Sequence, residues 1–237
     1  MSNLEEFQRR IAYTFKNSSL LVEALTHRSY SFEKKSDLPD NQRLEFFGDA
    51  ILELISSEYL FGRYTASCEG ELTKMRSAMT RGEALYELAV KLDLDNYLYL
   101  GKGEKQLKGK NEETRVIDAF EALVAAIYLD SDMASAKEFY LKLVKECWSN
   151  PFDLMVTQNP KGSLQELTQK KLNECPDYHL RAVSGQEHEP IYEVEVCVKG
   201  QVLGLGKAGS RKKAEELAAK EAHELLLRGD TPPKKTS

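Results

Sequence analysis

The sequence predicts a mainly α-helical N-terminal domain, followed by a small α+β domain whose elements run α-β-β-β-α. Three observations lead to this prediction. Apolar residues recur at helical spacing through residues 1–150, where few strand-like stretches occur. A segment with two prolines and several Asn, Ser and Gly residues follows at 149–163. Beyond it, apolar and polar residues alternate as they do in half-buried strands.

The N-terminal domain is expected to span residues 1–150, with a linker over 151–160. Helical spacing of apolar residues is clearest at 20–25, 51–60 and 120–128. Glycine-containing polar clusters at 68–71 and 101–111 separate these runs. The alternative for the linker is a surface loop within a single domain.

The second domain is expected to span residues 161–229. It begins with a helix over 163–172, in which Ser163 is the predicted N-cap and Glu166 completes a capping box. Strands follow at 178–183 and 191–198, and a turn at Lys199-Gly200 leads to a third strand at 201–208. The segment 210–227, rich in Ala, Leu and Glu, predicts the closing helix. Residues 230–237 form a polar tail that is expected to be disordered.

Composition narrows the class of protein. The chain has 237 residues and a mass of 26.9 kDa, and 41% of its residues are hydrophobic, which is enough for packed cores. Its apolar runs are too short to span a bilayer, and its first residues lack the pattern of a signal peptide. The four cysteines have no C-x-x-C spacing, which disfavours zinc and disulfides. These features predict a cytoplasmic protein without a membrane partner.

The charge is uneven along the chain. The net charge of −5 argues, taken alone, against a nucleic-acid partner. Residues 159–237 carry 13 Lys/Arg and 12 Asp/Glu, whereas the preceding residues carry 20 and 26. An acidic first part and a nearly neutral second part indicate two units with different tasks.

Two pairs of carboxylates stand out in apolar helices. Glu45 and Asp49 lie four residues apart, and Asp118 and Glu121 lie three apart, so each pair shares one helical face. Like charges on one face destabilise an isolated helix by roughly 0.2–0.5 kcal/mol per pair, and burial increases that cost unless a cation compensates. Four carboxylates converging from two helices would suit a hard divalent ion such as Mg²⁺.

The same spacing also fits ordinary structural roles for these acids. They could be solvated surface residues, and Asp118 could be a helix N-cap. No histidine or cysteine is spaced to join them as a ligand. Spacing also does not show that the two helices meet.

The segment N-Q-R-L-E-F-F-G-D-A-I-L (41–52) resembles the signature N-E-R-L-E-F-L-G-D of the ribonuclease III family. Further similar segments occur in the family's order at 24–30, 69–76, 101–104 and 118–130, so that the resemblance covers nearly the whole chain. It implies a double-stranded-RNA endonuclease whose metal-binding acids are Glu45, Asp49, Asp118 and Glu121. Asp49 and Glu121 are then the residues expected to act most directly in catalysis. The implied cofactor is Mg²⁺, with Mn²⁺ as a substitute, and no organic cofactor is expected.

The resemblance also assigns secondary roles. Gln42 stands where the family usually has Glu, so the accessory role of that acid is in doubt here, and Glu69 matches another acidic position near the site. Phe46 matches a residue that enters a pocket of a second subunit, which implies a homodimer, whereas Phe47 is expected to pack within its own chain. His27 is interpreted as a structural residue near a helix end, with a catalytic role as the alternative.

The second domain resembles a double-stranded-RNA-binding domain. The resemblance implies that Gln165 and Gln169 reach one minor groove of the RNA and that His188 contacts another. Cations at the start of the closing helix oppose its dipole, so a phosphate is their expected partner, with a solvated charge run as the alternative. Gly204 and Gly206 are expected to allow a close backbone approach there. By resemblance, the phosphate-binding cations are Arg211, Lys212 and Lys213.

The expected function is therefore a homodimeric, Mg²⁺-dependent endoribonuclease that cuts double-stranded RNA and leaves 5′-phosphate and 3′-hydroxyl ends. By resemblance, its tasks would be the processing of ribosomal RNA precursors and structured messenger RNAs. The alternative is a non-catalytic RNA-binding scaffold, which would have no reason to keep four repelling acids together. A phosphohydrolase acting on small molecules would leave the second domain unexplained.

Overall fold

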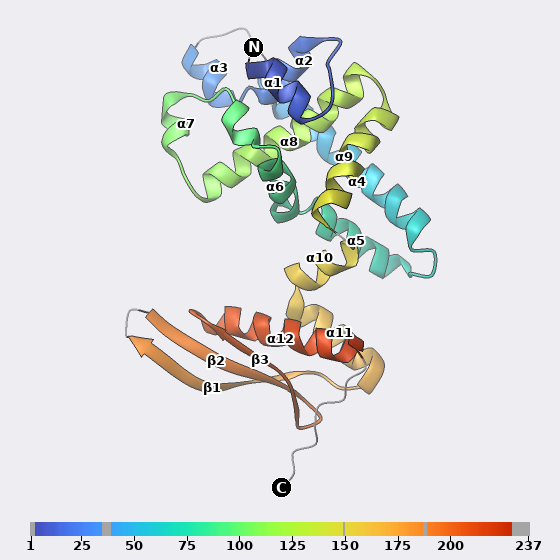
Figure 1. Ribbon diagram of the computed structural model, residues 1–237, viewed down its shortest axis with the longest axis vertical. Coiled ribbons are helices and arrows are strands. Elements are labelled where there is room, and N and C mark those ends of the chain that lie inside the picture. The colour runs from blue at the N-terminus through green and yellow to red at the C-terminus, as the bar shows by residue number, and fades with distance from the viewer. Residues whose placement is uncertain (1–2, 35–38, 149, 187–188, 229–237) are drawn as a thin grey trace. The chain divides into compact units, whose positions relative to one another are not determined.

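The computed structural model describes residues 3–34, 39–148, 150–186 and 189–228 (Figure 1). The chain divides into two compact units, Met1–Pro151 and Phe152–Ser237. The tail expected at 230–237 and the predicted RNA contact His188 both lie outside the described residues.

The first unit is helical throughout, as the sequence predicts. Its helices are α1 (Asn3–Arg10), α2 (Ser18–Leu25), α3 (Arg28–Lys34), α4 (Gln42–Arg63), α5 (Glu69–Thr80), α6 (Gly82–Lys91), the 3₁₀ helix η1 (Leu94–Tyr97), α7 (Lys102–Gln106), α8 (Lys110–Asp130) and α9 (Met133–Cys147).

Helix α8 is the centre of this unit, because α2, α4, α6 and α9 all pack against it. Every residue from Ala122 to Ile127 is fully buried, and four of the first five are Ala or Val. Small side chains let several helices approach one helix closely. At its end, the carboxylate of Asp130 accepts hydrogen bonds from the Tyr13 hydroxyl and from the backbone N–H groups of Lys16 and Asn17. These bonds join α8 to the segment that leads into α2.

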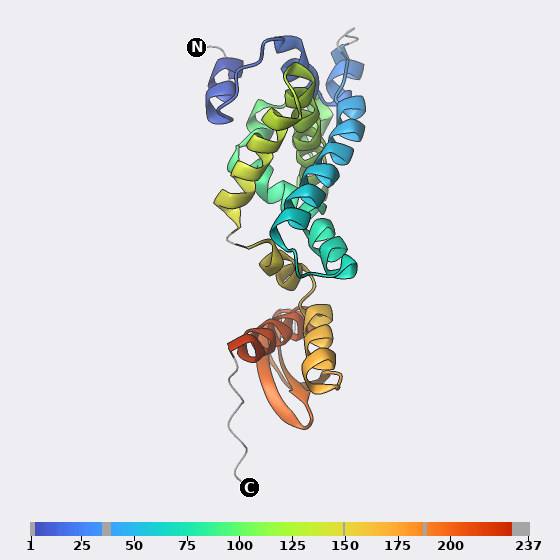
Figure 2. The same cartoon turned by 90° about the vertical axis from the view of Figure 1, so that its right-hand side faces the viewer.

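The second unit contains α10 (Pro151–Gln158), α11 (Pro160–Leu172), the strands β1 (Asp177–Gln186), β2 (Glu189–Val198) and β3 (Gln201–Ala208), and α12 (Arg211–Arg228). The segment expected as a linker thus contains a helix. From α11 onwards the order is α-β-β-β-α, as predicted, and the strands form an antiparallel sheet in the order β1-β2-β3. Figure 2 shows the same elements turned by 90°.

The predicted N-cap of α11 is wrong. The helix begins three residues before Ser163, at Pro160, because proline has a suitable φ at the first position. The side chain of Asn159 is the N-cap and accepts a hydrogen bond from the N–H of Gly162. Ser163 is buried instead, and its hydroxyl donates to the carbonyl oxygen of Met155 at 3.4 Å.

The close backbone approach expected at Gly204 and Gly206 is present, but it is made to helix α12 of the same unit. A Cβ at Gly204 would lie 2.3 Å from the carbonyl oxygen of Ala218, and one at Gly206 would lie 2.0 Å from that of Ala214. These glycines therefore let β3 pack against the backbone of α12. The core of this unit forms at that contact, from Leu164, Val196, Val198, Leu203, Ala218, Ala219 and Ala222.

Within the described ranges, no helix combines the length and apolar character needed to cross a membrane.

Candidate active site

Helices α4 and α8 meet through a glycine placed between the two acids of α4. A Cβ on Gly48 would lie only 1.9 Å from the carbonyl oxygen of Glu121, so the two backbones touch at this point. Beside it, the ring of Phe47 packs edge-on against Tyr128 of α8, with centroids 5.4 Å apart. The contact at Gly48 is what brings Glu45 and Asp49 close to the acids of α8.

The four acids interact electrostatically across these two helices. Burial raises the pKa of Glu121 to about 8, and the nearby charges of Asp49, Asp118 and Glu45 act in the same direction. The pKa of Asp118 rises to about 6, chiefly through burial and then through Glu45. Burial also raises the pKa of Glu45. The structure thus brings together two acidic pairs that are separated by about seventy residues in the sequence.

Asp118 is not a helix N-cap. The N-cap of α8 is Gly109, and Asp118 lies two turns inside the helix. Asp118 and Glu121 are partly buried, so neither is an ordinary solvated acid.

The donor set fits a divalent cation. Among the residues that the structure describes, no three His, Cys, Asp or Glu side chains are already arranged as a metal site. Carboxylates that repel one another are nevertheless the chemistry that Mg²⁺ satisfies, because it prefers oxygen ligands and compensates their charge. The raised pKa values of Asp118 and Glu121 show that the charge of neither carboxylate is fully compensated, and a bound cation would provide the missing positive charge. Glu45, Asp49, Asp118 and Glu121 would be the residues that hold such an ion.

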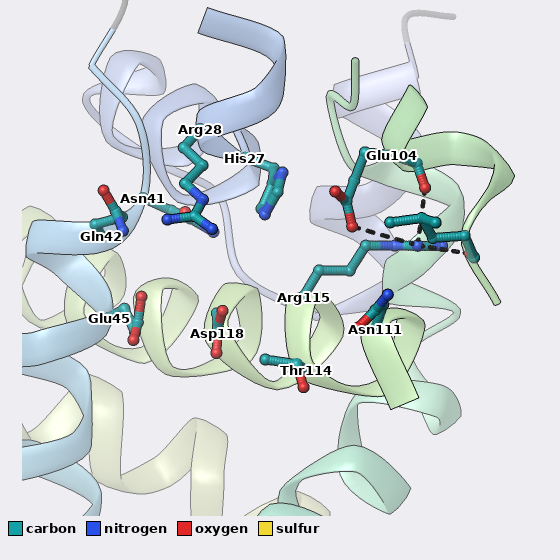
Figure 3. Close-up of a pocket in the computed structure, with 11 residues that line it drawn as sticks. His27, Arg28, Asn41, Gln42, Glu45, Glu104, Asn111, Thr114, Arg115 and Asp118 are labelled. Carbon is teal, nitrogen blue, oxygen red and sulfur yellow. Dashed lines mark hydrogen bonds and ion pairs between the residues drawn. The ribbon is translucent and has the colours of Figure 1, made fainter. Parts of the chain in front are cut away.

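A cavity of about 410 Å³ opens beside the acids (Figure 3). Gln42 lies in this cavity together with Glu45 and Asp118. Its amide oxygen is an uncharged candidate metal ligand in the same cavity as these two acids. The cavity is lined by His27, Arg28, Asn41, Gln42, Glu45, Glu104, Leu107, Asn111, Thr114, Arg115 and Asp118.

The far wall of the cavity depends on Arg115, a buried arginine that sequence reasoning missed. Only 2% of Arg115 is exposed, and its Nε donates to Asp95 at 3.1 Å. Its Nη1 donates to the backbone carbonyl oxygens of Glu104 and Leu107 at 3.2 and 3.0 Å. Figure 3 shows the bonding of Arg115 to Glu104 on the side of the cavity away from Glu45. A signal was available, because Arg115 precedes the buried residues Val116 and Ala119 on the apolar face of α8.

His27 makes the local bonds expected of a structural residue. Its Nδ1 lies 2.8 Å from the Ser29 hydroxyl oxygen, which accepts a hydrogen bond from the N–H of Gly101. Its backbone N–H donates to the carbonyl oxygen of Tyr99. Burial lowers the pKa of His27, so the ring favours its neutral form. These bonds join the start of α3 to the segment before α7.

Phe46 and Glu69 lie apart from the acidic cavity. Phe46 is 82% exposed and belongs to an exposed apolar stripe on α4 that also includes Leu54 and Phe61. A second cavity of about 610 Å³ is lined by Leu54, Phe61, Leu72 and Glu69, among others. Within one chain Glu69 lines this second cavity and not the one that contains Glu45 and Asp118, and its carboxylate accepts a hydrogen bond from the Thr73 hydroxyl.

The second unit exposes most of the side chains predicted to bind RNA. Gln165 and Gln169 are both exposed and lie one turn apart on α11. Lys212 and Lys213 are exposed at the start of α12. Arg211 differs, because its Nε donates to Glu215 at 3.0 Å, and Glu215 also accepts from Lys161 at 2.6 Å. Its charge is therefore already partly compensated.

Two family models match the chain. The model described as Ribonuclease-III-like matches residues 17–147, which include all four acids. The model of the double-stranded RNA binding motif matches residues 160–226.

Individual proteins are similar over nearly the full length. The ribonuclease 3 of Oleidesulfovibrio alaskensis is 42% identical over 223 residues, which cover 94% of this chain and 97% of that protein. The ribonuclease 3 of Nitratiruptor sp. is 38% identical over 227 residues, which cover 95% of this chain and 98% of that protein. A solved structure of the nuclease domain of ribonuclease III from Campylobacter jejuni, concerned with flexibility in a region involved in dimer formation, aligns with a TM-score of 0.58. It is 33% identical and covers 62% of this chain and 100% of that domain.

Proposed function

The chain belongs to the ribonuclease III family, and we propose that Glu45, Asp49, Asp118 and Glu121 form its catalytic centre. The protein is an endoribonuclease that acts on double-stranded RNA, since it combines the family's nuclease domain with a double-stranded RNA binding motif. The observation that carries the proposed centre is the mutual electrostatic interaction of the four acids across α4 and α8. The test is the substitution Glu121→Gln, which is expected to abolish cleavage and preserve RNA binding.

The nuclease belongs to a metal-dependent class, and the metal in this proposal is Mg²⁺, with Mn²⁺ as a substitute. Bound ions would supply an activated water and charge compensation for the phosphoryl oxygens and the leaving 3′ oxygen. The protein's own part is to bring its carboxylates together and aim them at one point, with Asp49 and Glu121 acting most directly; a bound cation would favour their ionised form. Gly48 fixes the distance between the helices that carry them. The proposed products carry 5′-phosphate and 3′-hydroxyl ends.

The proposed substrates are ribosomal RNA precursors and structured messenger RNAs, which places the reaction in the cytoplasm. The alternative, a non-catalytic RNA-binding scaffold, is not favoured. A scaffold gains nothing from four neighbouring acids whose charges, together with burial, raise the pKa of Asp118 and Glu121, whereas a cation-dependent nuclease requires them. The four free cysteines suit a reducing compartment.

The same proposal includes a homodimer, with Phe46 as an anchor. The exposed apolar stripe on α4 consists of Phe46, Leu54 and Phe61. The cavity of about 610 Å³, which is largely apolar, opens beside Leu54 and Phe61. In a two-fold symmetric dimer each anchor occurs twice, so one exposed ring makes two contacts. The solved Campylobacter jejuni nuclease domain, which has a region involved in dimer formation, supports this assignment.

Phe46→Ala is expected to raise the dimer dissociation constant by about three orders of magnitude, because two rings are lost at about 2 kcal/mol each. Sedimentation at several protein concentrations measures this constant. Phe32→Ala is the matched control, since Phe32 is even more exposed at 90% but lies on α3. Equal dissociation constants for the wild type and Phe46→Ala would contradict the role of Phe46.

The double variant Lys212→Ala/Lys213→Ala is expected to weaken RNA binding and to flatten its salt dependence by about one unit of slope per lost phosphate contact. Arg211→Ala should change the slope less, because Glu215 already compensates Arg211. The measurement is RNA-duplex binding by fluorescence anisotropy in Ca²⁺ at several KCl concentrations. Lys142→Ala, an exposed residue of α9, is the control, and an unchanged slope in the double variant would argue against phosphate contact.

A further inference from the structure

We propose that Arg28 and Asn41 form an anion subsite beside the four acids, which takes a phosphate of the RNA strand that is cut. The subsite lies in the cavity of about 410 Å³ that also contains Glu45 and Asp118 (Figure 3). It rests on the proposed function, because the phosphate it takes belongs to the substrate of the acidic centre.

Asn41 provides a buried donor without a partner. Only 2% of the residue is exposed, and among the described residues its Nδ2 has no hydrogen-bond acceptor. A buried amide group of this kind costs about 1–3 kcal/mol unless a partner satisfies it. The cavity that Asn41 lines is where such a partner can bind.

The side chain of Asn41 is also not used for helix capping, although it stands at the N-cap of α4. Its backbone there is in the right-handed helical region, and its side chain makes no capping bond. Instead, Asp40 accepts the N–H of Gln42 at 3.2 Å. The backbone of Asn41 is held firmly, because its N–H donates to Thr26 and its carbonyl oxygen accepts from Glu45. A backbone held by two hydrogen bonds therefore carries an amide Nδ2 that has no hydrogen-bond partner among the described residues.

Arg28 adds a positive charge to the same cavity. It is the first residue of α3, and Figure 3 shows its guanidinium group pointing from α3 towards Glu45 and Asp118. Its charge opposes the rise that burial causes in the pKa of both acids. No ion pair within 4.0 Å engages it among the residues that the structure describes, in contrast to the fully bonded Arg115 in the same cavity.

The chemistry of these two groups selects an anion. A guanidinium group carries only donors, and the Nδ2 of an amide is also a donor, so their shared ligand must offer acceptor oxygens. Arginine binds phosphate through two parallel N–H bonds, and every linkage of the RNA backbone offers phosphate oxygens as acceptors. The position next to the acids places this phosphate close to the bond that is hydrolysed.

Arg28 could instead serve only to compensate the charge of the acids. The two roles differ in what happens when Arg28 is removed. A phosphate contact contributes about one unit to the salt slope of RNA binding, and its loss removes that unit. A cation that merely competes with Mg²⁺ for the carboxylates contributes nothing to the slope, and its removal lowers the Mg²⁺ concentration needed for half-maximal cleavage.

The test uses the full chain with Arg28→Ala and Asn41→Ala. RNA-duplex binding is measured by anisotropy in Ca²⁺ at several KCl concentrations, and single-turnover cleavage is measured against Mg²⁺ concentration. For Arg28→Ala we expect affinity to fall about ten- to a hundredfold, as for a charge-assisted hydrogen bond. The salt slope should fall by about one, and the half-maximal Mg²⁺ concentration should not change. For Asn41→Ala we expect about a three- to tenfold loss of affinity with an unchanged slope.

Arg43→Ala is the matched control, because Arg43 is an exposed arginine of α4 that acts on Glu23 and does not line the cavity. Asn41→Asp keeps the shape of Asn41 but replaces its donor with a negative charge, so it should weaken binding more than Asn41→Ala. An Arg28→Ala variant with the wild-type salt slope would overturn the subsite, whatever its cleavage rate. Failure of the acidic centre would appear separately, because binding in Ca²⁺ requires no cleavage.

Discussion

Glu121→Gln is expected to lose cleavage by at least about two to three orders of magnitude while it still binds duplex RNA in Ca²⁺. Metal ions contribute several kcal/mol to the stabilisation of a phosphoryl transition state, and each 1.36 kcal/mol changes the rate about tenfold. Glutamine keeps the shape of the side chain but removes the charge that holds the ion. Glu121 is the most strongly perturbed of the four acids, since burial and three neighbouring carboxylates raise its pKa to about 8.

The matched control is Glu113→Gln, the same substitution at an exposed position on the same helix. Single-turnover cleavage of a labelled RNA duplex and its binding in Ca²⁺ are measured on both variants. Trp148 is the only tryptophan and lies in the nuclease unit, so its fluorescence reports whether that unit is folded. Cleavage at the wild-type rate by Glu121→Gln would refute the catalytic centre.

Gly48→Ala is expected to reduce both cleavage and stability. The added methyl group would lie 1.9 Å from the carbonyl oxygen of Glu121, so α4 and α8 must move apart. Overpacking of this kind costs about 1–3 kcal/mol, and a displacement of about 1 Å in a catalytic site can cost a hundredfold in rate. Because the acids sit on both sides of this contact, the separation moves Glu45 and Asp49 away from Asp118 and Glu121.

Gly62→Ala is the corresponding control within the same helix. A Cβ there meets nothing within 4 Å, so alanine should stabilise α4 by about 0.5–1 kcal/mol and leave cleavage unchanged. Urea denaturation followed by Trp148 fluorescence gives the stability, and single-turnover cleavage gives the rate. If Gly48→Ala behaved like Gly62→Ala, the close helix contact would not be what aligns the acids.

Periodicity and alternation were sufficient to predict the fold, because these patterns are set by local geometry. The helical first unit and the α-β-β-β-α order of the second follow from them, and β3 spans the predicted residues. The start of α11 was misplaced because Ser163 and Asn159 are both good N-caps, and Pro160 decides between them. The choice between the two possible N-caps, Asn159 and Ser163, therefore depends on Pro160 alone.

The meeting of the four acids could not be predicted from spacing, because nothing local in 41–52 or 110–130 encodes their mutual distance. Resemblance to a family supplied the expectation, and Gly48 supplies the physical reason. Long-range contacts are also the reason why the bonding partners of Arg115 and the unpaired amide of Asn41 were missed. The bonds of Arg115 reach Asp95 and Glu104, and the unused amide of Asn41 is visible only once Asp40 is seen to serve the backbone of α4.

Helix α8 is both the core of its unit and the carrier of Asp118 and Glu121. A frayed or rotated turn in it would therefore disturb the whole domain and the acids together. The arrangement of the acids cannot be lost gradually while the rest of the unit stays intact, because the same turns of α8 form the core and carry Asp118 and Glu121. Homologues that vary in loops and at their ends would accordingly be expected to keep the sequence of the alanine-rich middle of α8 nearly unchanged.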